Sequence, residues 1–393
     1  MARDRTRRTR RLLVAGSFTL LLGLLLAEGG LRLYFRLAPP PADSRYLPDP
    51  EAGYRLRPGP FWEDGRSPDD IVNSFGFRDR EPLIPKPDGL YRIVGIGDSF
   101  VLGAVPLERN FLRVAEAEAA ERFADDSLQV EISMMGLGGY GPENEVGVLR
   151  SAALRLSPDL VVLCFYVGND VTGVLLRGEV LGGELYFTRS SNPLHDLLRR
   201  SRLFVLLERT ATNFWRLRNL EKERGRPGRE EPADPYRPTM YYRLILKKRL
   251  PVYESPPSER IERLWRRTES ALAEFDRVCA SAGVPWILLA IPAEEQVDPR
   301  VRARVLESLS VDPAGYDFDA PQRRLRAFAD ARGIDLIDLL PVFRAATVDP
   351  RLYIPNDTHW NEEGNALAGR ILADAIIERI RSRPARTTAS SGR

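Results

Sequence analysis

The chain has 393 residues, of which 43% are hydrophobic and 29% charged, and its formal net charge is only +3. This composition is typical of a globular protein with a large core and excludes a disordered chain, while the length allows one α/β domain with insertions or two to three domains. The small net charge does not indicate a polyanionic partner, and no nucleic-acid partner is expected.

The N-terminal 36 residues predict a membrane anchor. Six arginines lie in the first eleven residues and are followed by an uncharged run, Leu12–Ala27. Sixteen helical residues span about 24 Å, short of a hydrocarbon core of about 30 Å. A helix that continues to Leu33 is long enough to cross the hydrocarbon core if Glu28 lies at the membrane interface. A cleaved secretory peptide is the alternative, and either way the rest of the chain is expected on the extracytoplasmic side.

Residues 37–90 contain many prolines and glycines and are expected to form an irregular, strand-containing arm. From Tyr91 onward, short apolar runs alternate with helical patterns. Five strands are expected, in YRIVGIGD, LQVEISMM, DLVVLCFYVG, VPWILLAIP and GIDLIDLL. Helices are expected in FLRVAEAEAAERF, over residues 143–156, and in RIERLWRRTESALAEFDRVCA, PQRRLRAFADAR and EEGNALAGRILADAIIERI. This alternation predicts a flavodoxin-like, doubly wound α/β fold with a five-stranded parallel sheet over residues 91–383, followed by a disordered tail at 384–393.

A long insertion, residues 171–258, separates the third predicted strand from its helix. Its basic and apolar residues are interleaved, as in LLRRSRLFVLLERTATNFWRLRNL. We expect a packed helical hairpin followed by a solvated basic loop, KERGRPGREEPADP. A lid, or an amphipathic helix on anionic lipid or polymer, is the alternative.

The two cysteines, Cys164 and Cys279, each lie in an apolar run, so both are expected to be small buried hydrophobic residues, with a disulfide as the alternative. Neither cysteines nor histidines show metal-ligand spacing. No metal and no cofactor are therefore expected.

Three groups of residues follow the first three predicted strands, whose carboxyl ends share one edge of the sheet. Ser99, in GDSF, has an exposed hydroxyl beside a helix start. Gly139, in GLGGYG, lets a backbone N–H approach an oxyanion, and Asn169, in VGND, offers side-chain amide donors. Taken singly, each also fits an ordinary cap or turn.

Asp357 and His359, in PNDTHWNEEG, form a fourth group before the closing helix. A carboxylate that accepts from one ring nitrogen leaves the other to face a nucleophile. Alone, the pair also fits a surface ion pair. The second histidine, His195, is expected to be structural or solvated. The joint occurrence of serine, glycine, asparagine and the Asp/His pair favours a catalytic site.

The chain resembles the SGNH, or GDSL-type, hydrolase family over roughly residues 91–380. GDS at 97–99, Gly139 in GLGGYG, GND at 168–170 and NDTHWNEEG match four family blocks in type, order and spacing. The resemblance implies a Ser-His-Asp esterase with Ser99 as nucleophile, His359 as base and Asp357 as its orienting group. It also implies an oxyanion hole made by the N–H groups of Ser99 and Gly139 and the Asn169 side chain.

Two positions depart from the family pattern. Met134 replaces the asparagine that often opens the second block, and Asp357 precedes His359 by two residues instead of three. The shorter spacing, with Trp360, resembles polysaccharide O-acetyltransferases of the alginate type. Hydrolysis of carboxylic, O-acyl or acetyl esters is therefore the leading function, and acyl transfer to a polysaccharide is the alternative. A third possible function is that of a non-catalytic binding protein of the cell envelope. The substrate is expected to be an ester-bearing carbohydrate, lipid or small molecule.

Overall fold

The computed structural model of the chain describes residues 2–38, 41–42, 44–60, 71–126, 128–172, 178–181, 184–187, 193–211, 214, 238–346 and 351–382. Its contacts divide the chain into two compact units. One comprises Met1–Pro48 with Leu175–Glu231, and the other comprises Asp49–Val174 with Pro232–Arg393.

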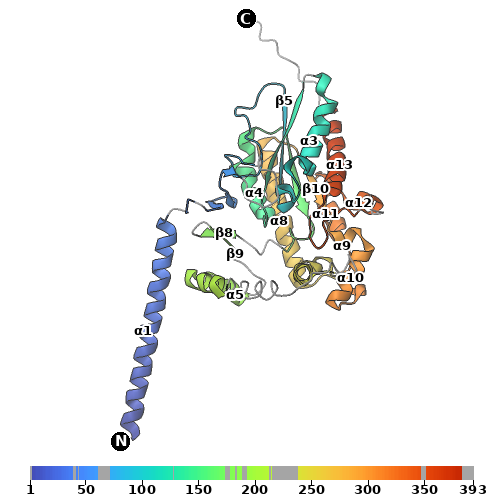
Figure 1. The fold of residues 1–393 in the computed structure, drawn as a ribbon. Helices are drawn as coiled ribbons and strands as arrows, with labels where there is room; N and C mark the ends of the chain where they lie inside the picture. Colours follow the sequence, from blue (N-terminus) through green and yellow to red (C-terminus); the bar gives the residue numbers. More distant parts are fainter. Residues whose placement is uncertain are drawn as a thin grey trace, which may run out of the picture. The chain divides into compact units, whose positions relative to one another are not determined.

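The larger unit is built on a five-stranded parallel sheet. Its strands are β5 (Leu90–Gly97), β6 (Gln129–Gly136), β7 (Leu160–Tyr166), β10 (Trp286–Ile291) and β11 (Asp335–Asp338). Their spatial order is β11-β10-β7-β5-β6, which is 2-1-3-4-5 in chain order (Figure 1). This is the flavodoxin-like order, so the predicted fold class is confirmed. Gly97 pairs with Gly136 on one side and Cys164 on the other, which brings the ends of three strands level.

Helices cover both faces of this sheet. Helices α3 (Phe111–Arg122) and α13 (Glu362–Arg381) pack together on one face, while α4 (Pro142–Ser151) and α8 (Glu259–Ala282) pack together on the other (Figure 1). Every residue of β7 and β10 is buried, which explains their unbroken apolar runs. The remaining elements of this part are α2 (Ser99–Leu102), η1 (Leu107–Arg109), η2 (Ala124–Asp126), η3 (Ala153–Leu156), α7 (Met240–Arg249), η5 (Leu250–Tyr253), α9 (Glu294–Val297), α10 (Pro299–Leu309), η6 (Pro313–Gly315), α11 (Ala320–Asp330) and α12 (Leu340–Ala346).

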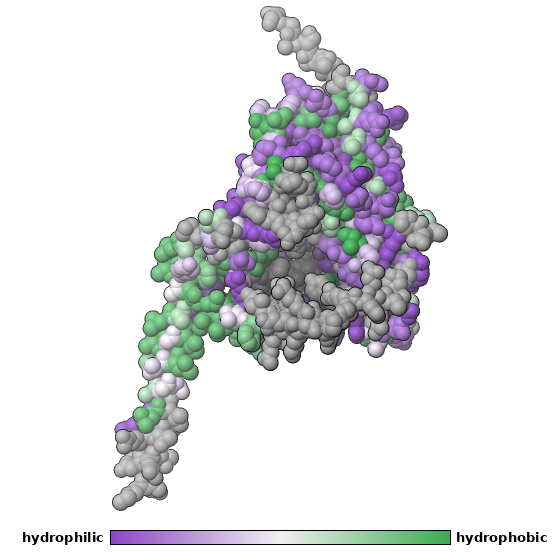
Figure 2. Space-filling view, viewed as in Figure 1, coloured by the Kyte–Doolittle hydropathy of each residue, from purple (hydrophilic) through white to green (hydrophobic). Residues whose placement is uncertain are grey.

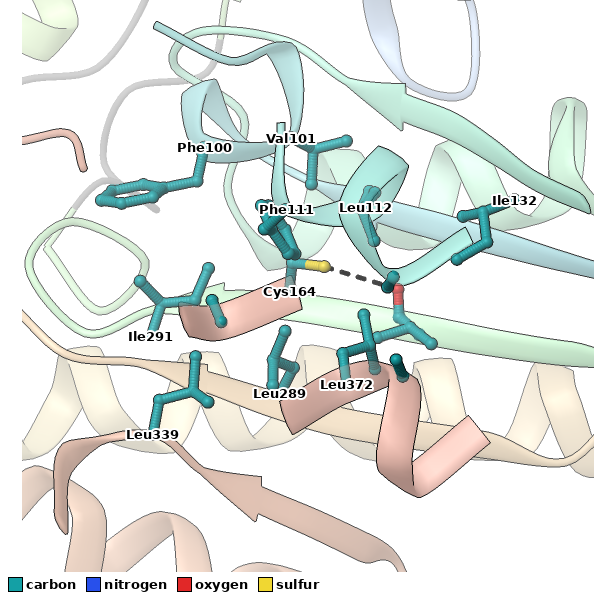
Figure 3. Close-up of a cluster of buried hydrophobic side chains, with 14 of the residues drawn as sticks. Phe100, Val101, Phe111, Leu112, Ile132, Cys164, Leu289, Ile291, Leu339 and Leu372 are labelled. Atoms are coloured by element: carbon teal, nitrogen blue, oxygen red, sulfur yellow. Dashed lines mark hydrogen bonds between the residues drawn. The ribbon is translucent and has the colours of Figure 1, made fainter. Parts of the chain in front are cut away.

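One apolar cluster joins the sheet to α2, α3 and α13. Figure 3 shows Phe100, Phe111 and Leu372, which come from these three helices, gathered with Cys164 of β7 and Leu289 of β10. Cys164 and Cys279 are both buried and free, as their apolar surroundings in the sequence predicted, and no disulfide joins them.

An arm of short strands precedes the sheet and is held by buried polar contacts. It contains β2 (Gly53–Leu56) and the antiparallel pair β3 (Gly59–Pro60) and β4 (Ile71–Val72). Asp79, only 2% exposed, pairs with Arg113 of α3 and accepts from the backbone N–H of Met134 at 2.7 Å. One carboxylate therefore ties the arm to a helix and to a strand.

The smaller unit contains α1 (Ala2–Leu37), the hairpin β8 (Gly178–Leu181)–β9 (Glu184–Phe187), α5 (Pro193–Leu198) and a helix over residues 202–211; β1 (Tyr46–Asp49) runs across the boundary between the units. Within α1, Val14–Leu37 is long and apolar enough to cross a membrane, with none of its apolar window buried. The two helices correspond to part of the predicted helical hairpin, whereas the predicted basic loop and the C-terminal tail lie outside the described residues. The β8–β9 hairpin was not predicted.

The Asp79 contacts generate a stability prediction. We expect Asp79→Ala to lower the free energy of unfolding by about 3 kcal/mol, because it leaves the Arg113 guanidinium with one carboxylate fewer in a buried site. Denaturant unfolding of the full chain in detergent measures this. As a matched control, Glu307→Ala removes the exposed pair with Arg304 and should change that energy by less than about 1 kcal/mol. Equal losses in the two variants would contradict the assigned role of Asp79.

Candidate active site

Ser99, His359 and Asp357 form a continuous hydrogen-bonded chain, although 260 residues separate the serine from the histidine. His359 Nε2 lies 2.8 Å from Ser99 Oγ, and His359 Nδ1 lies 2.6 Å from Asp357 Oδ1. A proton on Nδ1 donates to the carboxylate and leaves Nε2 free to accept the serine hydroxyl proton. The three residues singled out in the sequence are thus brought together in the order that such a relay requires.

Ser99 is positioned by a tight turn from β5 into α2. Asp98 caps this helix by accepting from the Phe100 N–H at 2.9 Å. A Cβ atom on Gly97 would lie 2.7 Å from Val101 Cγ2 and 2.9 Å from the Cys164 carbonyl oxygen. Glycine at position 97 therefore allows the helix to start immediately above the strand, with Ser99 as its first residue.

His359 is held by a short antiparallel pairing and a buried indole. The Ile354 N–H donates to the His359 carbonyl at 3.0 Å. Next to this bond, the backbones of Tyr353 and Trp360 pair in an isolated antiparallel β-bridge. Trp360 is fully buried, and its ring lies 4.9 Å from Phe100 between centroids. It also packs on Phe111 and Phe343, at 5.6 and 4.9 Å. The tryptophan beside the histidine thus fixes the backbone from which the imidazole projects.

Asp357 remains ionised over the ordinary pH range. Burial acts to raise its pKa, but hydrogen bonds from the His359 ring and from the N–H groups of Thr358 and His359 outweigh burial and lower the pKa to about 2. A permanent carboxylate facing Nδ1 fixes the tautomer and stabilises an imidazolium when His359 takes a proton.

Gly139 and Asn169, which the sequence predicts as oxyanion donors, lie in loops next to the turn that carries Ser99. Gly139 has φ +88°, a conformation that favours glycine, and a Cβ on its neighbour Gly138 would lie 3.9 Å from Ser99 Cβ. Asn169 Nδ2 donates to Asp98 Oδ2 at 2.8 Å. This bond uses one of its two amide hydrogens and anchors the side chain next to the serine. The loops of three strands therefore converge at one point on the sheet edge.

A tyrosine of the arm, which the sequence analysis did not single out, supports the glycine loop. The hydroxyl of Tyr54, in β2, donates to the Gly138 carbonyl at 3.0 Å, and its ring packs edge-on against Tyr140 with centroids 4.9 Å apart. The Gly138 C=O and the Gly139 N–H belong to one planar peptide unit and point in opposite directions. Fixing the carbonyl therefore fixes the direction of the Gly139 N–H. No sequence signal links a tyrosine at 54 to a loop at 138.

The arm also supports α2. The guanidinium of Arg78, 1% exposed, donates from Nη1 to the Leu102 and Val105 carbonyls at 3.0 and 3.2 Å. These carbonyls lie at the end of α2 and in the loop that follows it. Arg78 thus holds the far end of the helix that begins with Ser99.

Three fully buried acids, Asp98, Glu145 and Asp170, lie beneath this site. Burial raises the pKa of each, and their mutual repulsion raises the pKa of Glu145 and Asp170 further, well above the ordinary range. Burial thus favours the protonated form of Glu145 and Asp170.

His195 belongs to the smaller unit, where its Nε2 lies 2.8 Å from Glu208 Oε1. This contact joins α5 to the helix over residues 202–211. Among the described residues, no cluster of three or more His, Cys, Asp or Glu side chains could hold a metal ion.

Comparison with known protein families finds a model that matches part of the chain. Residues 254–391 match the SGNH hydrolase-like domain of the acetyltransferase AlgX family, a range that includes Asp357 and His359 and begins after Ser99. No curated protein matches the chain.

Several solved structures show a distant likeness to the chain. An acylhydrolase structure from Bacteroides fragilis is 12% identical, with 77% of this chain and 92% of that one covered and a TM-score of 0.37. A GDSL-like lipase from Bacteroides thetaiotaomicron is 12% identical, with 76% and 93% covered and a TM-score of 0.36. An acetylxylan esterase mutant from Geobacillus stearothermophilus is 13% identical, with 74% and 94% covered and a TM-score of 0.38. These distant likenesses carry no argument about function. Over residues 254–391 the chain is similar to an SGNH hydrolase-like domain.

Proposed function

We propose that this protein is a serine esterase that acts on O-acyl esters, acetyl esters among them, through Ser99, His359 and Asp357. The observation that carries the proposal is the 2.8 Å approach of His359 Nε2 to Ser99 Oγ, with Asp357 on the opposite ring nitrogen at 2.6 Å. An imidazole shared in this way between a carboxylate and a hydroxyl activates the hydroxyl as a nucleophile.

The reaction proceeds in two halves. His359 Nε2 takes the hydroxyl proton as Ser99 Oγ attacks the ester carbonyl, and the oxyanion accepts hydrogen bonds from the N–H groups of Ser99 and Gly139 and from the Asn169 amide. The imidazolium then gives its proton to the departing alkoxide, which leaves an acyl group on Ser99. Water attacks this ester, passes a proton to His359 and releases the acid, and the proton returns to the serine.

A polysaccharide O-acetyltransferase is the second candidate, and the match to the acetyltransferase AlgX family favours it. The first half of the reaction is unchanged, and a sugar hydroxyl then replaces water as the acceptor. Both candidates fit an ester-bearing substrate outside the cytoplasm. We further propose that α1 anchors the protein in the membrane, because Val14–Leu37 is apolar and follows an arginine-rich start.

The first test removes the nucleophile. We expect Ser99→Ala to lower the turnover of a chromogenic acetyl ester by at least about a thousandfold, as happens when a triad member is lost. Ser308→Ala is the matched control, since that hydroxyl bonds only to the Val305 carbonyl of its own helix in the contacts of the described residues. A Ser99→Ala protein that keeps more than a tenth of the parent's turnover would reject the proposal.

The second test distinguishes the two acceptors. Purified protein is incubated with an acetyl ester, with and without unacetylated oligosaccharide, and both free acetate and sugar-bound acetyl are quantified. Hydrolysis predicts acetate release that the sugar leaves unchanged. Acetyl groups appearing on the sugar at the expense of free acetate, and absent with Ser99→Ala, would instead establish transfer.

The third test concerns Tyr54. We expect Tyr54→Phe to lower kcat about tenfold and to leave KM nearly unchanged, because its hydroxyl orients the Gly138–Gly139 peptide, whose N–H is needed most in the transition state. Steady-state kinetics on the acetyl ester measure both constants. Tyr186→Phe, which removes a tyrosine hydroxyl in the smaller unit, serves as the control. An effect confined to KM would contradict this role.

A further inference from the structure

We propose that residues 193–211 form a second membrane contact, a helical hairpin whose outer face lies in the lipid interface beside the anchor helix α1. The hairpin consists of α5 (Pro193–Leu198) and the helix over residues 202–211. Its partner would be the phospholipid bilayer itself. The inference rests on the proposed anchoring of α1 and is independent of the ester chemistry.

The hairpin has its polar groups on the inside. Glu208, on the second helix, pairs with His195 at 2.8 Å and with the Nε atom of Arg199 at 2.9 Å, so the two helices meet through charged side chains. The His195 and Phe204 rings pack edge-on with centroids 5.7 Å apart. In a hairpin surrounded by water, charged side chains of this kind ordinarily face the solvent.

The outer face of the hairpin is apolar. Leu194, Leu197 and Leu198 follow one another at helical spacing on α5 and are 63, 58 and 42% exposed. Leu206 and Leu207 on the second helix are 37 and 59% exposed. A cluster of large exposed leucines on helices whose charges pair internally indicates contact with an apolar medium.

This hairpin is fastened to α1 at the only acidic residue of the apolar span. Glu28 accepts from Ser201 Oγ at 2.7 Å and from the N–H groups of Arg202 and Leu203 at 3.0 and 2.9 Å. Arg32 pairs with Glu28 at 2.7 Å and donates to the Arg200 carbonyl at 2.6 Å. A carboxylate in a membrane-spanning segment is costly unless it is partnered, and the start of the second helix supplies those partners.

The position of Glu28 sets the depth of the contact. The uncharged run from Leu12 to Ala27 spans about 24 Å of helix, somewhat less than a hydrocarbon core of about 30 Å. Glu28 therefore lies near the outer boundary of the core, where an amphipathic helix rests in the interface. Figure 2 shows α1 as largely green, and exposed leucines of α1 lie on both sides of Glu28 in the sequence, among them Leu26 and Leu33.

Lipid fits this surface better than an acidic polymer. The outer face carries five exposed leucines, whereas a polyanion would be held by a row of exposed cations. Arg200 is exposed at the turn between the helices, where its long side chain can reach lipid phosphates while the leucines enter the acyl region.

The test places a fluorescent label at single added cysteines in the full chain, reconstituted in vesicles of phosphatidylcholine and phosphatidylglycerol. The positions are Leu197→Cys and Leu207→Cys in the hairpin, Leu24→Cys in α1, and Leu83→Cys as a matched control that is 63% exposed in the larger unit. The parent chain, whose two cysteines are buried, gives the labelling background. Quenching by iodide in the water is compared with quenching by nitroxide-bearing lipids.

We expect lipid quenching at positions 24, 197 and 207, with iodide quenching at 197 and 207 about fivefold weaker than at 83. Iodide quenching at 197 and 207 equal to that at 83, with lipid quenching at 24, would overturn the hairpin contact alone. Absence of lipid quenching at 24 would overturn the anchor and this inference together. Protection from iodide that appears only after dextran sulfate is added would overturn lipid as the partner. None of these results bears on Ser99.

Discussion

The contact between Phe100 and Trp360, with ring centroids 4.9 Å apart, joins the two segments that carry the proposed nucleophile and base. Each aromatic residue directly follows a polar one, so packing the two rings in the core brings Ser99 and His359 to the same place. The rings are buried with Phe111 and Phe343, and apolar burial thus supplies the free energy that closes a loop of 260 residues. The hydrogen bonds from His359 to Ser99 and Asp357 then set the orientation of the three side chains.

Polar contacts refine what the apolar core positions. The arm before the sheet reaches two parts of the site: Arg78 holds the end of α2, and Tyr54 holds the peptide that carries the Gly139 N–H. The same arm reaches β6, since the Met134 N–H donates to Asp79. The arm therefore supports both this strand and the glycine loop that follows it.

The sheet, its order and the convergence of Ser99, Asp357 and His359 could be predicted because strand periodicity and four local blocks lie in the sequence itself. The parallel register then brings the strand ends together. The roles of Tyr54 and Arg78 could not be predicted, because each depends on a contact between segments that share no local pattern. The hydrogen bonds between Glu28 and residues 201–203 could not be predicted for the same reason. The sequence shows an acidic residue in an apolar run, but not the distant residues that bond to it.

The most direct test of the account is the rate at which a fluorophosphonate labels Ser99, followed by peptide mass spectrometry in the parent and in His359→Gln. This reagent needs only an activated serine, so the result does not depend on the natural substrate or acceptor. The account predicts a single adduct on Ser99, formed at least about a thousandfold more slowly without the imidazole. Labelling of Ser99 at an unchanged rate in His359→Gln, or an adduct on another serine, would contradict it.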